Sequence, residues 1–249
     1  MERQQKTKGL NRDFIKYCAM FTMFLNHFAT AFLSPGTVLY EVLIDIGYFT
    51  AVTMCYFLVE GYYYTHSKKK YAWRLFIFAL ISEVPYCLAL GVIMLNMMFT
   101  LLLCFFILLV LDDQSLGKVK YVLTVLLVLA SIFSDWALLA PVFTIMFYTW
   151  KDDRGKTALA FGVAAALFFG FNMLSYTGIY PAAEAFLRSV AASLGIVVSG
   201  IVILNFYNGK QAAGGRKFSK WFFYIFYPGH LLLIAAIRFS VDGLPGIFL

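Results

Sequence analysis

The chain has 249 residues, of which 62% are hydrophobic and 13% are charged. Soluble domains are roughly 45–50% apolar and 25% charged, so this composition argues against a water-soluble fold. The formal net charge of +7 does not indicate a nucleic-acid partner, because the basic residues are spread over short loops and are not clustered on a soluble face.

The predicted elements are apolar helices separated by charged or Gly/Pro-containing breaks. A bilayer crossing takes about 20 apolar residues. In chain order, the spans are predicted at residues 14–33, 43–64, 74–90, 95–111, 119–134, 136–150, 157–175, 183–206 and 219–238. The sequence therefore predicts an all-α fold, a polytopic transmembrane helix bundle of about nine spans that forms one domain over residues 1–249.

Residues 119–150 fit one long helix as well as two short ones, and the charge distribution favours two. With two helices, 18 of the 20 Lys and Arg residues lie on one side of the membrane, and Arg188 and Arg238 lie on the other. Cytoplasmic loops carry the excess of Lys and Arg, so we predict a cytoplasmic N-terminus. The four cysteines lie in apolar stretches without a C-x-x-C pair, and we expect neither a disulfide nor a metal site.

Several ionisable residues fall within the predicted spans, where each is costly and therefore suggests a functional site. At about 1.5 Å of rise per residue, four of them lie about 12–16 Å from the nearest cytoplasmic charge: His27, Glu60, Glu83 and His230. This common depth predicts a polar site near the middle of the membrane. Asp135 is expected nearer the outside.

Asn96 and Thr100 lie one helical turn apart, which suits hydrogen bonding to a substrate. We therefore regard Glu60, Asn96, Thr100 and His230 as candidate substrate-binding residues. The alternative for Asn96, Thr100 and His230 is a structural role that joins two helices, and for Glu60 it is a side chain that only extends towards the basic residues of the loop.

Lys16 and His27 are separated by eleven positions, which places them about 20° apart on one helix face. A cation at the cytoplasmic mouth and an imidazole deeper in the membrane suit the transfer of an activated group. His27 would act as general base, and a carboxylate would stabilise the imidazolium. We take Glu83 as the preferred carboxylate and Asp135 as a further catalytic candidate.

The last cytoplasmic loop is a flexible, glycine-containing segment with several basic residues. Exposed backbone N–H groups together with Lys and Arg bind phosphate well. The candidates for holding the phosphates of a donor are Lys16, Arg74, Asn205, Asn208, Lys210, Arg216 and Lys217. The alternative is a loop whose charges only obey the positive-inside rule.

Several motifs together resemble the TraX family of membrane proteins, which is named for F-pilin N-acetylation. They are F-L-V-E-G-Y-Y-Y-T from Phe57, R-L-x-I-F-A-L-I-S-E-V-P-Y from Arg74, N-M-M-F-T-L-L from Asn96, D-W at Asp135, N-x-x-N-G-K from Asn205 and K-W-F-F-Y-I-F-Y-P-G-H-L from Lys220. The resemblance extends over residues 12–235.

The resemblance implies an acetyltransferase related to the acyltransferase-3 group, whose first span carries a basic residue, ten intervening positions and a His, as Lys16 and His27 do. It further implies acetyl-CoA as the donor, a peptide amine, sugar or other hydroxyl as the acceptor, and a multi-pass location in the bacterial inner membrane, in contact with lipid. The alternatives are a small transporter with a midplane proton or substrate site and a non-catalytic membrane partner protein.

Overall fold

The computed structural model describes residues 9–242, apart from the side chains at positions 216, 217 and 242. Its helices are α1 (Arg12–Phe32), α2 (Val38–Tyr64), α3 (Lys68–Leu90), α4 (Met97–Asp112), α5 (Val119–Ala130), α6 (Leu139–Trp150), α7 (Arg154–Tyr176), α8 (Ala182–Ile201) and α9 (Arg216–Asp242). Two 3-10 turns, η1 (Gln114–Leu116) and η2 (Ser131–Phe133), and a π-helical turn, η3 (Val202–Phe206), complete them. The β-bridges within residues 9–242 are isolated ones, which confirms the all-α fold class.

The helices lie where the apolar runs predicted them, and residues 119–150 form two helices joined by a turn. Five helices are long and apolar enough to cross a membrane: α2, α3, α7, α8 continued by η3, and α9. These five indicate a multi-pass membrane protein. Helices α4, α5 and α6 are shorter apolar helices, so the number of spans and the orientation stay predictions.

Side chains at the helix starts explain where several helices begin. Asn11 accepts a hydrogen bond from the Phe14 nitrogen at 2.9 Å, and Ser67 accepts one from the Lys70 nitrogen at 3.2 Å. Each satisfies a backbone donor that the first helical turn leaves open. Helix α3 ends at Gly91, whose φ of 69° is a left-handed conformation that glycine adopts without strain.

Within residues 9–242 the chain forms two compact units, of which the first comprises residues up to 53 and residues 161–227, and the second comprises residues 54–160 and those from 228 onward. Three helices, α2, α7 and α9, contribute residues to both units. The expectation of a single domain stays a prediction. The two units are described separately below.

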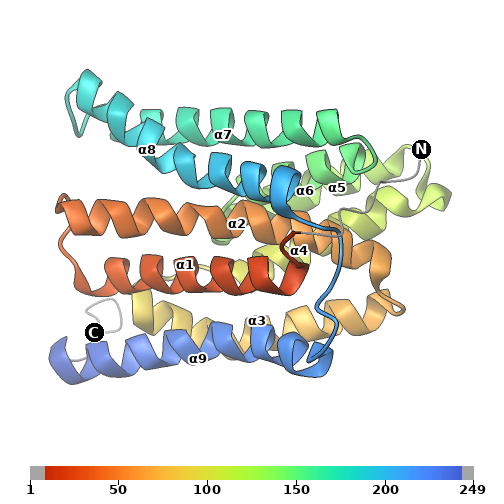
Figure 1. The fold of residues 1–249 in the computed structure, drawn as a ribbon, viewed down its shortest axis with the longest axis horizontal. Coiled ribbons are helices and arrows are strands. Elements are labelled where there is room, and N and C mark those ends of the chain that lie inside the picture. Colours follow the sequence, from red (N-terminus) through yellow and green to blue (C-terminus); the bar gives the residue numbers. More distant parts are fainter. Residues whose placement is uncertain (1–8, 243–249) are drawn as a thin grey trace. The chain divides into compact units, whose positions relative to one another are not determined.

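Close helix packing holds the first unit together, and α1 lies beside the first part of α2 (Figure 1). The Asn26 amide donates to the Ile44 carbonyl at 3.0 Å, and the Thr50 hydroxyl donates to the Ala19 carbonyl at 2.6 Å. Helix α8 approaches α2 at Gly195, where a Cβ atom would lie 2.8 Å from α2 backbone atoms. Small residues and interhelical hydrogen bonds drive helix association in membranes.

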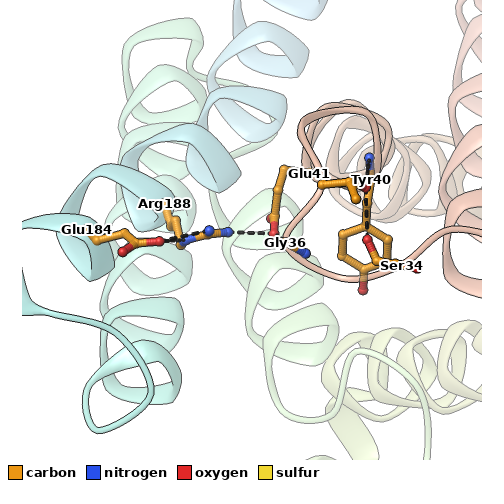
Figure 2. Close-up of polar contacts among 7 residues, drawn as sticks. Ser34, Gly36, Tyr40, Glu41, Glu184 and Arg188 are labelled. Atoms are coloured by element: carbon orange, nitrogen blue, oxygen red, sulfur yellow. Dashed lines mark hydrogen bonds and ion pairs between the residues drawn. The ribbon is translucent and has the colours of Figure 1, made fainter.

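An ion-pair network joins α2 and α8 at the end of the first unit where α2 begins. Figure 2 shows the Arg188 guanidinium between the carboxylates of Glu41 and Glu184, with N–O distances of 2.5 and 2.9 Å. Glu41 also accepts a hydrogen bond from the Gly36 nitrogen at 3.2 Å, and the Tyr180 ring lies 4.2 Å from the guanidinium carbon. The network attaches the turn that precedes α2 to helix α8.

Helix α4 is the centre of the second unit, where it packs against α3, α5 and α6. Cys104, Phe105, Ile107 and Leu108 have no exposed surface. A helix that is apolar all round is one that is covered on all sides. The short length of α4 therefore reflects a core position and not an exposed one.

We expect Gly195→Ala to destabilise the protein by about 1–3 kcal/mol, the usual effect of overpacking. The added methyl group would collide with the Asp45 carbonyl oxygen and the Phe49 nitrogen of α2, each 2.8 Å away. Thermal unfolding of the purified protein measures the effect. Gly162→Ala is the matched control, since a Cβ atom at Gly162 meets nothing within 4 Å. Equal melting temperatures for Gly195→Ala and the wild type would contradict this account.

Candidate functional site

Lys16 and His27 both lie against the first part of α9, within the first unit. The Lys16 ammonium is 4.9 Å from the centre of the Phe223 ring. The His27 imidazole is 8% exposed, and its centre lies 6.5 Å from that of Tyr227 in an edge-to-face arrangement. The two residues thus share the α1 face that packs on α9, as their spacing predicts.

Backbone pairing at the start of α1 orders the last loop, which the sequence presents as flexible. The Leu10 nitrogen donates to the Phe206 carbonyl at 2.8 Å, the Asn208 nitrogen to the Leu10 carbonyl at 3.0 Å, and the Arg12 nitrogen to the Lys210 carbonyl at 2.8 Å. The buried carboxylate of Asp13 accepts from the Ala212 nitrogen at 3.3 Å. Residues 206–212 are therefore anchored to α1.

This pairing brings three predicted donor-binding residues to one end of the first unit. The Asn208 side chain is used in the pairing, since its amide donates to the Gly9 carbonyl at 3.2 Å and its oxygen accepts from the Lys210 nitrogen at 2.9 Å. The Lys210 side chain is exposed. Asn205 lies in the π-helical turn η3, and such turns are frequent at functional sites.

The other donor-binding candidates fall elsewhere. Arg74 belongs to the second unit, where its guanidinium carbon lies 5.4 Å from the centre of the Tyr71 ring. The side chains of Arg216 and Lys217 lie outside the described residues.

Glu83 and Asn96 form the first polar cluster of the second unit. The Glu83 Oε2 atom accepts hydrogen bonds from the Asn96 Nδ2 atom at 2.7 Å and from the Asn96 backbone nitrogen at 3.1 Å. Asn96 has no exposed surface; its Nδ2 atom also donates to the Ala79 carbonyl at 2.8 Å, and its Oδ1 atom caps α4 at the Met98 nitrogen at 2.9 Å. The polar atoms of Asn96 are therefore all engaged within the protein.

Thr100 and Asp135 form the second cluster of that unit. The Thr100 hydroxyl donates to the Asp135 carbonyl oxygen at 2.6 Å, and the Asp135 Oδ1 atom accepts from the Trp136 nitrogen at 2.9 Å. The sequence proposes Asn96 and Thr100 for substrate binding, and that role stays a prediction. In the structure the two side chains hold Glu83 and the backbone of Asp135.

Glu60 and His230 also belong to the second unit, where Glu60 is half-buried on α2 and His230 is 5% exposed on α9. His27 belongs to the first unit, so its pairing with Glu83 stays a prediction. Among residues 9–242, no group of three His, Cys, Asp or Glu side chains is arranged to hold a metal ion.

Sequence reasoning misses a cluster at the end of α4. The Lys68 ammonium donates to the Asp112 carboxylate at 2.8 Å, and the Tyr62 hydroxyl donates to the same oxygen at 2.8 Å. These hydrogen bonds, first that from Lys68, lower the pKa of the Asp112 carboxyl, which lies just beyond the predicted span 95–111. The sequence signal that could have predicted this pair is a lysine at the start of α3 and an aspartate at the end of α4.

Comparison with known proteins identifies the family. The model of the TraX protein family matches residues 11–238. The chain belongs to the TraX family. It is also 28% identical to a protein of Dichelobacter nodosus described as "Probable fimbrial assembly protein FimC, serogroup H1", over 90% of this chain and 94% of that one. No solved structure matches significantly.

We expect Asn96→Ala to destabilise the protein by about 1–3 kcal/mol or more, because it removes both a helix cap and the donor to a buried carboxylate. Thermal unfolding measures this change. Ser175→Ala serves as the control, since the exposed Ser175 hydroxyl donates only to the Phe171 carbonyl of its own helix. An Asn96→Ala protein as stable as this control would show that the Glu83 contact carries little weight.

Proposed function

We propose that this protein is an integral membrane acyltransferase that transfers an acetyl group from acetyl-CoA to an amine or a hydroxyl. The observation that carries the proposal is the family match over residues 11–238, combined with Lys16 and His27 on one face of α1. The resemblance implies the same spacing of a basic residue and a His in the first span. The buried imidazole supplies a base.

The donor is proposed to bind at the end of the first unit where α1 begins. The ordered segment 206–212, the Lys16 ammonium and the exposed Lys210 side chain belong to this end of the unit. Cations and backbone N–H groups are the partners that phosphates favour. The Tyr17 hydroxyl, 3.0 Å from that of Ser219, joins the start of α9 to the same region.

The proposed reaction uses His27 in its neutral form. The imidazole accepts the proton of the acceptor while the acceptor nitrogen or oxygen attacks the thioester carbonyl. The carbon–sulfur bond then breaks, and the proton passes to the departing thiolate. The products are an acetylated acceptor and free CoA.

The acceptor is proposed to be a peptide amine, a sugar or another hydroxyl compound. The description of the Dichelobacter nodosus relative as a probable fimbrial assembly protein favours a subunit of a surface fibre among these. The family resemblance, through pilin N-acetylation, favours the same class.

We further propose that the chain crosses the bacterial inner membrane about nine times, with its N-terminus in the cytoplasm. The positions of the basic residues support this orientation. The Lys68–Asp112 ion pair supports this topology, in which the start of α3 and the end of α4 lie on the same side of the membrane.

Cysteine labelling tests the orientation in a variant without the four native cysteines. We expect Pro35→Cys to react with a membrane-impermeant maleimide added outside the cell. Lys69→Cys and Asp152→Cys should react only after the membrane is opened, because basic loops stay in the cytoplasm. Reaction of Asp152→Cys from outside would show that residues 119–150 cross the membrane once.

Replacement of His27 tests the mechanism. We expect His27→Ala to lower acetyl transfer by about 10²-fold or more, the usual contribution of a positioned base. The binding of acetyl-CoA, measured by calorimetric titration, and the melting temperature should change little.

The matched control is His66→Ala, since His66 is exposed in the loop after α2. This variant should keep the wild-type rate. Full activity in well-folded His27→Ala protein would contradict the proposed mechanism. Failure of the wild-type protein to bind acetyl-CoA would refute the acyltransferase assignment itself and favour the transporter.

A further inference from the structure

Three helices of the second unit are shorter than the thickness of the hydrocarbon core. Helix α4 has 16 residues, and α5 and α6 have 12 residues each. At about 1.5 Å per residue these lengths are about 24, 18 and 18 Å, below the hydrocarbon thickness of about 30 Å. Because Lys118 and Lys151 flank the α5–α6 hairpin on the proposed cytoplasmic side, the turn at residues 131–138 lies at membrane depth.

The distances along α3 and α4 place the turn at the same depth as Glu83 and Asn96. Measured from the Lys68–Asp112 pair, Glu83 lies about 22 Å along α3 and Asn96 about 24 Å along α4, and the two are hydrogen bonded. The neighbouring Leu95 nitrogen donates to the Phe133 carbonyl at 3.0 Å, and the Asp135 nitrogen donates to the Leu95 carbonyl at 2.8 Å. Asp135 therefore lies beside Asn96 at this depth.

The turn between α5 and α6 is strained. Trp136 has φ 55°, and Leu138 has φ 60° with ψ −41°, although neither is glycine. The Leu139 nitrogen donates to the Ala137 carbonyl at 2.6 Å, which closes a γ-turn with positive φ at its centre. This hand of γ-turn is rare and strained, and such residues cluster at active sites and ligand clamps.

Neighbouring hydroxyl groups hold the turn in this conformation. The Ser131 hydroxyl accepts from the Leu138 nitrogen at 3.0 Å, and the Ser134 hydroxyl donates to the Ser131 carbonyl at 2.9 Å. The Thr100 hydroxyl donates to the Asp135 carbonyl at 2.6 Å. Irregular backbone at membrane depth is retained only inside the protein or beside a water-filled space.

The two carboxylates near this turn are in different situations. Glu83 accepts two hydrogen bonds from Asn96 on one oxygen, so it is fixed in place. The Asp135 Oδ1 atom accepts from the adjacent Trp136 nitrogen. Within residues 9–242, no hydrogen bond reaches its Oδ2 atom and no cation pairs with it. Asp135 thus keeps one carboxylate oxygen for another group.

We propose that the strained turn at residues 131–138 binds the acyl acceptor, with the Asp135 Oδ2 atom accepting a hydrogen bond from an N–H or O–H group of the acceptor other than the one whose proton His27 accepts. Thr100 and Ser131 are positioning residues, which act through the backbone of the turn. This assignment rests on the proposed acyltransferase function and adds the place where the acceptor binds.

The test uses the purified full-length protein with hydroxylamine as a small acceptor and thiol release from acetyl-CoA as the readout. Asp135→Asn keeps an oxygen for the Trp136 nitrogen but loses the charge. We expect it to lower kcat/KM for hydroxylamine by about tenfold or more, with unchanged acetyl-CoA affinity and melting temperature. Thr100→Val should raise KM for hydroxylamine without changing acetyl-CoA affinity.

Glycine substitutions provide a readout that a purely structural turn would not give. Leu138→Gly relieves the positive φ, so its melting temperature should rise by about 2–6 °C while hydroxylamine acetylation falls. Ala137→Gly is the matched control, because Ala137 has no positive φ to relieve, and its melting temperature should not rise. A Leu138→Gly protein that is more stable and fully active would overturn the proposal.

Carbodiimide labelling followed by mass spectrometry tests the site without acyl transfer. A carbodiimide adds to a carboxyl group in an apolar setting when one of its oxygens is accessible. We expect Asp135 to be modified in preference to Glu83 when hydroxylamine, which would itself capture an activated carboxyl, is left out. Modification of Glu83 alone would overturn the proposal. Absence of thiol release from wild-type protein in which Asp135 is labelled in preference to Glu83 would refute the acyltransferase function and leave the accessible Asp135 oxygen as a binding site.

Discussion

One side chain, that of Asn96, satisfies the polar groups on which the second unit depends. In the proposed topology these groups lie at membrane depth, where no water is present to complete a backbone or carboxylate hydrogen bond. Asn96 donates to Glu83 and to the Ala79 carbonyl, and it accepts from the Met98 nitrogen. It thereby fixes the start of α4 and the Glu83 carboxylate together. Because the adjacent Leu95 pairs with residues 133–135, the turn between α5 and α6 depends on the same contact.

The helices themselves were predictable, because long apolar runs separated by charged breaks leave few other solutions. The segment 183–206, for example, corresponds to α8 and η3. The hydrogen-bond partners of the polar side chains were not predictable. The spacing of Asn96 and Thr100 shows that two polar groups share a helix face, but not whether they meet a substrate or the protein. In the structure Asn96 donates a hydrogen bond to Glu83, and Thr100 donates one to the Asp135 carbonyl.

Two other features lie beyond local sequence patterns for different reasons. The pairing of Leu10 with the segment after η3 joins residues almost 200 positions apart, and an apolar period carries no information about such a contact. The γ-turn at Leu138 has a positive φ without a glycine at that position. Turn prediction relies on residues that adopt positive φ without strain. It therefore does not detect a strained turn such as Asp135–Leu139.

Four carboxylates among the described residues differ in their partners. Glu41 is paired with Arg188, and Asp112 with Lys68, each near the end of a helix. Glu83 and Asp135 meet only neutral donors among the described residues. A carboxylate without a cation is costly at membrane depth, and such residues are kept where the chemistry uses them. Since Asn96 fixes one of these two carboxylates while the other keeps an oxygen for a further group, their environments suit different tasks, as in other sites where two carboxyl groups take separate roles.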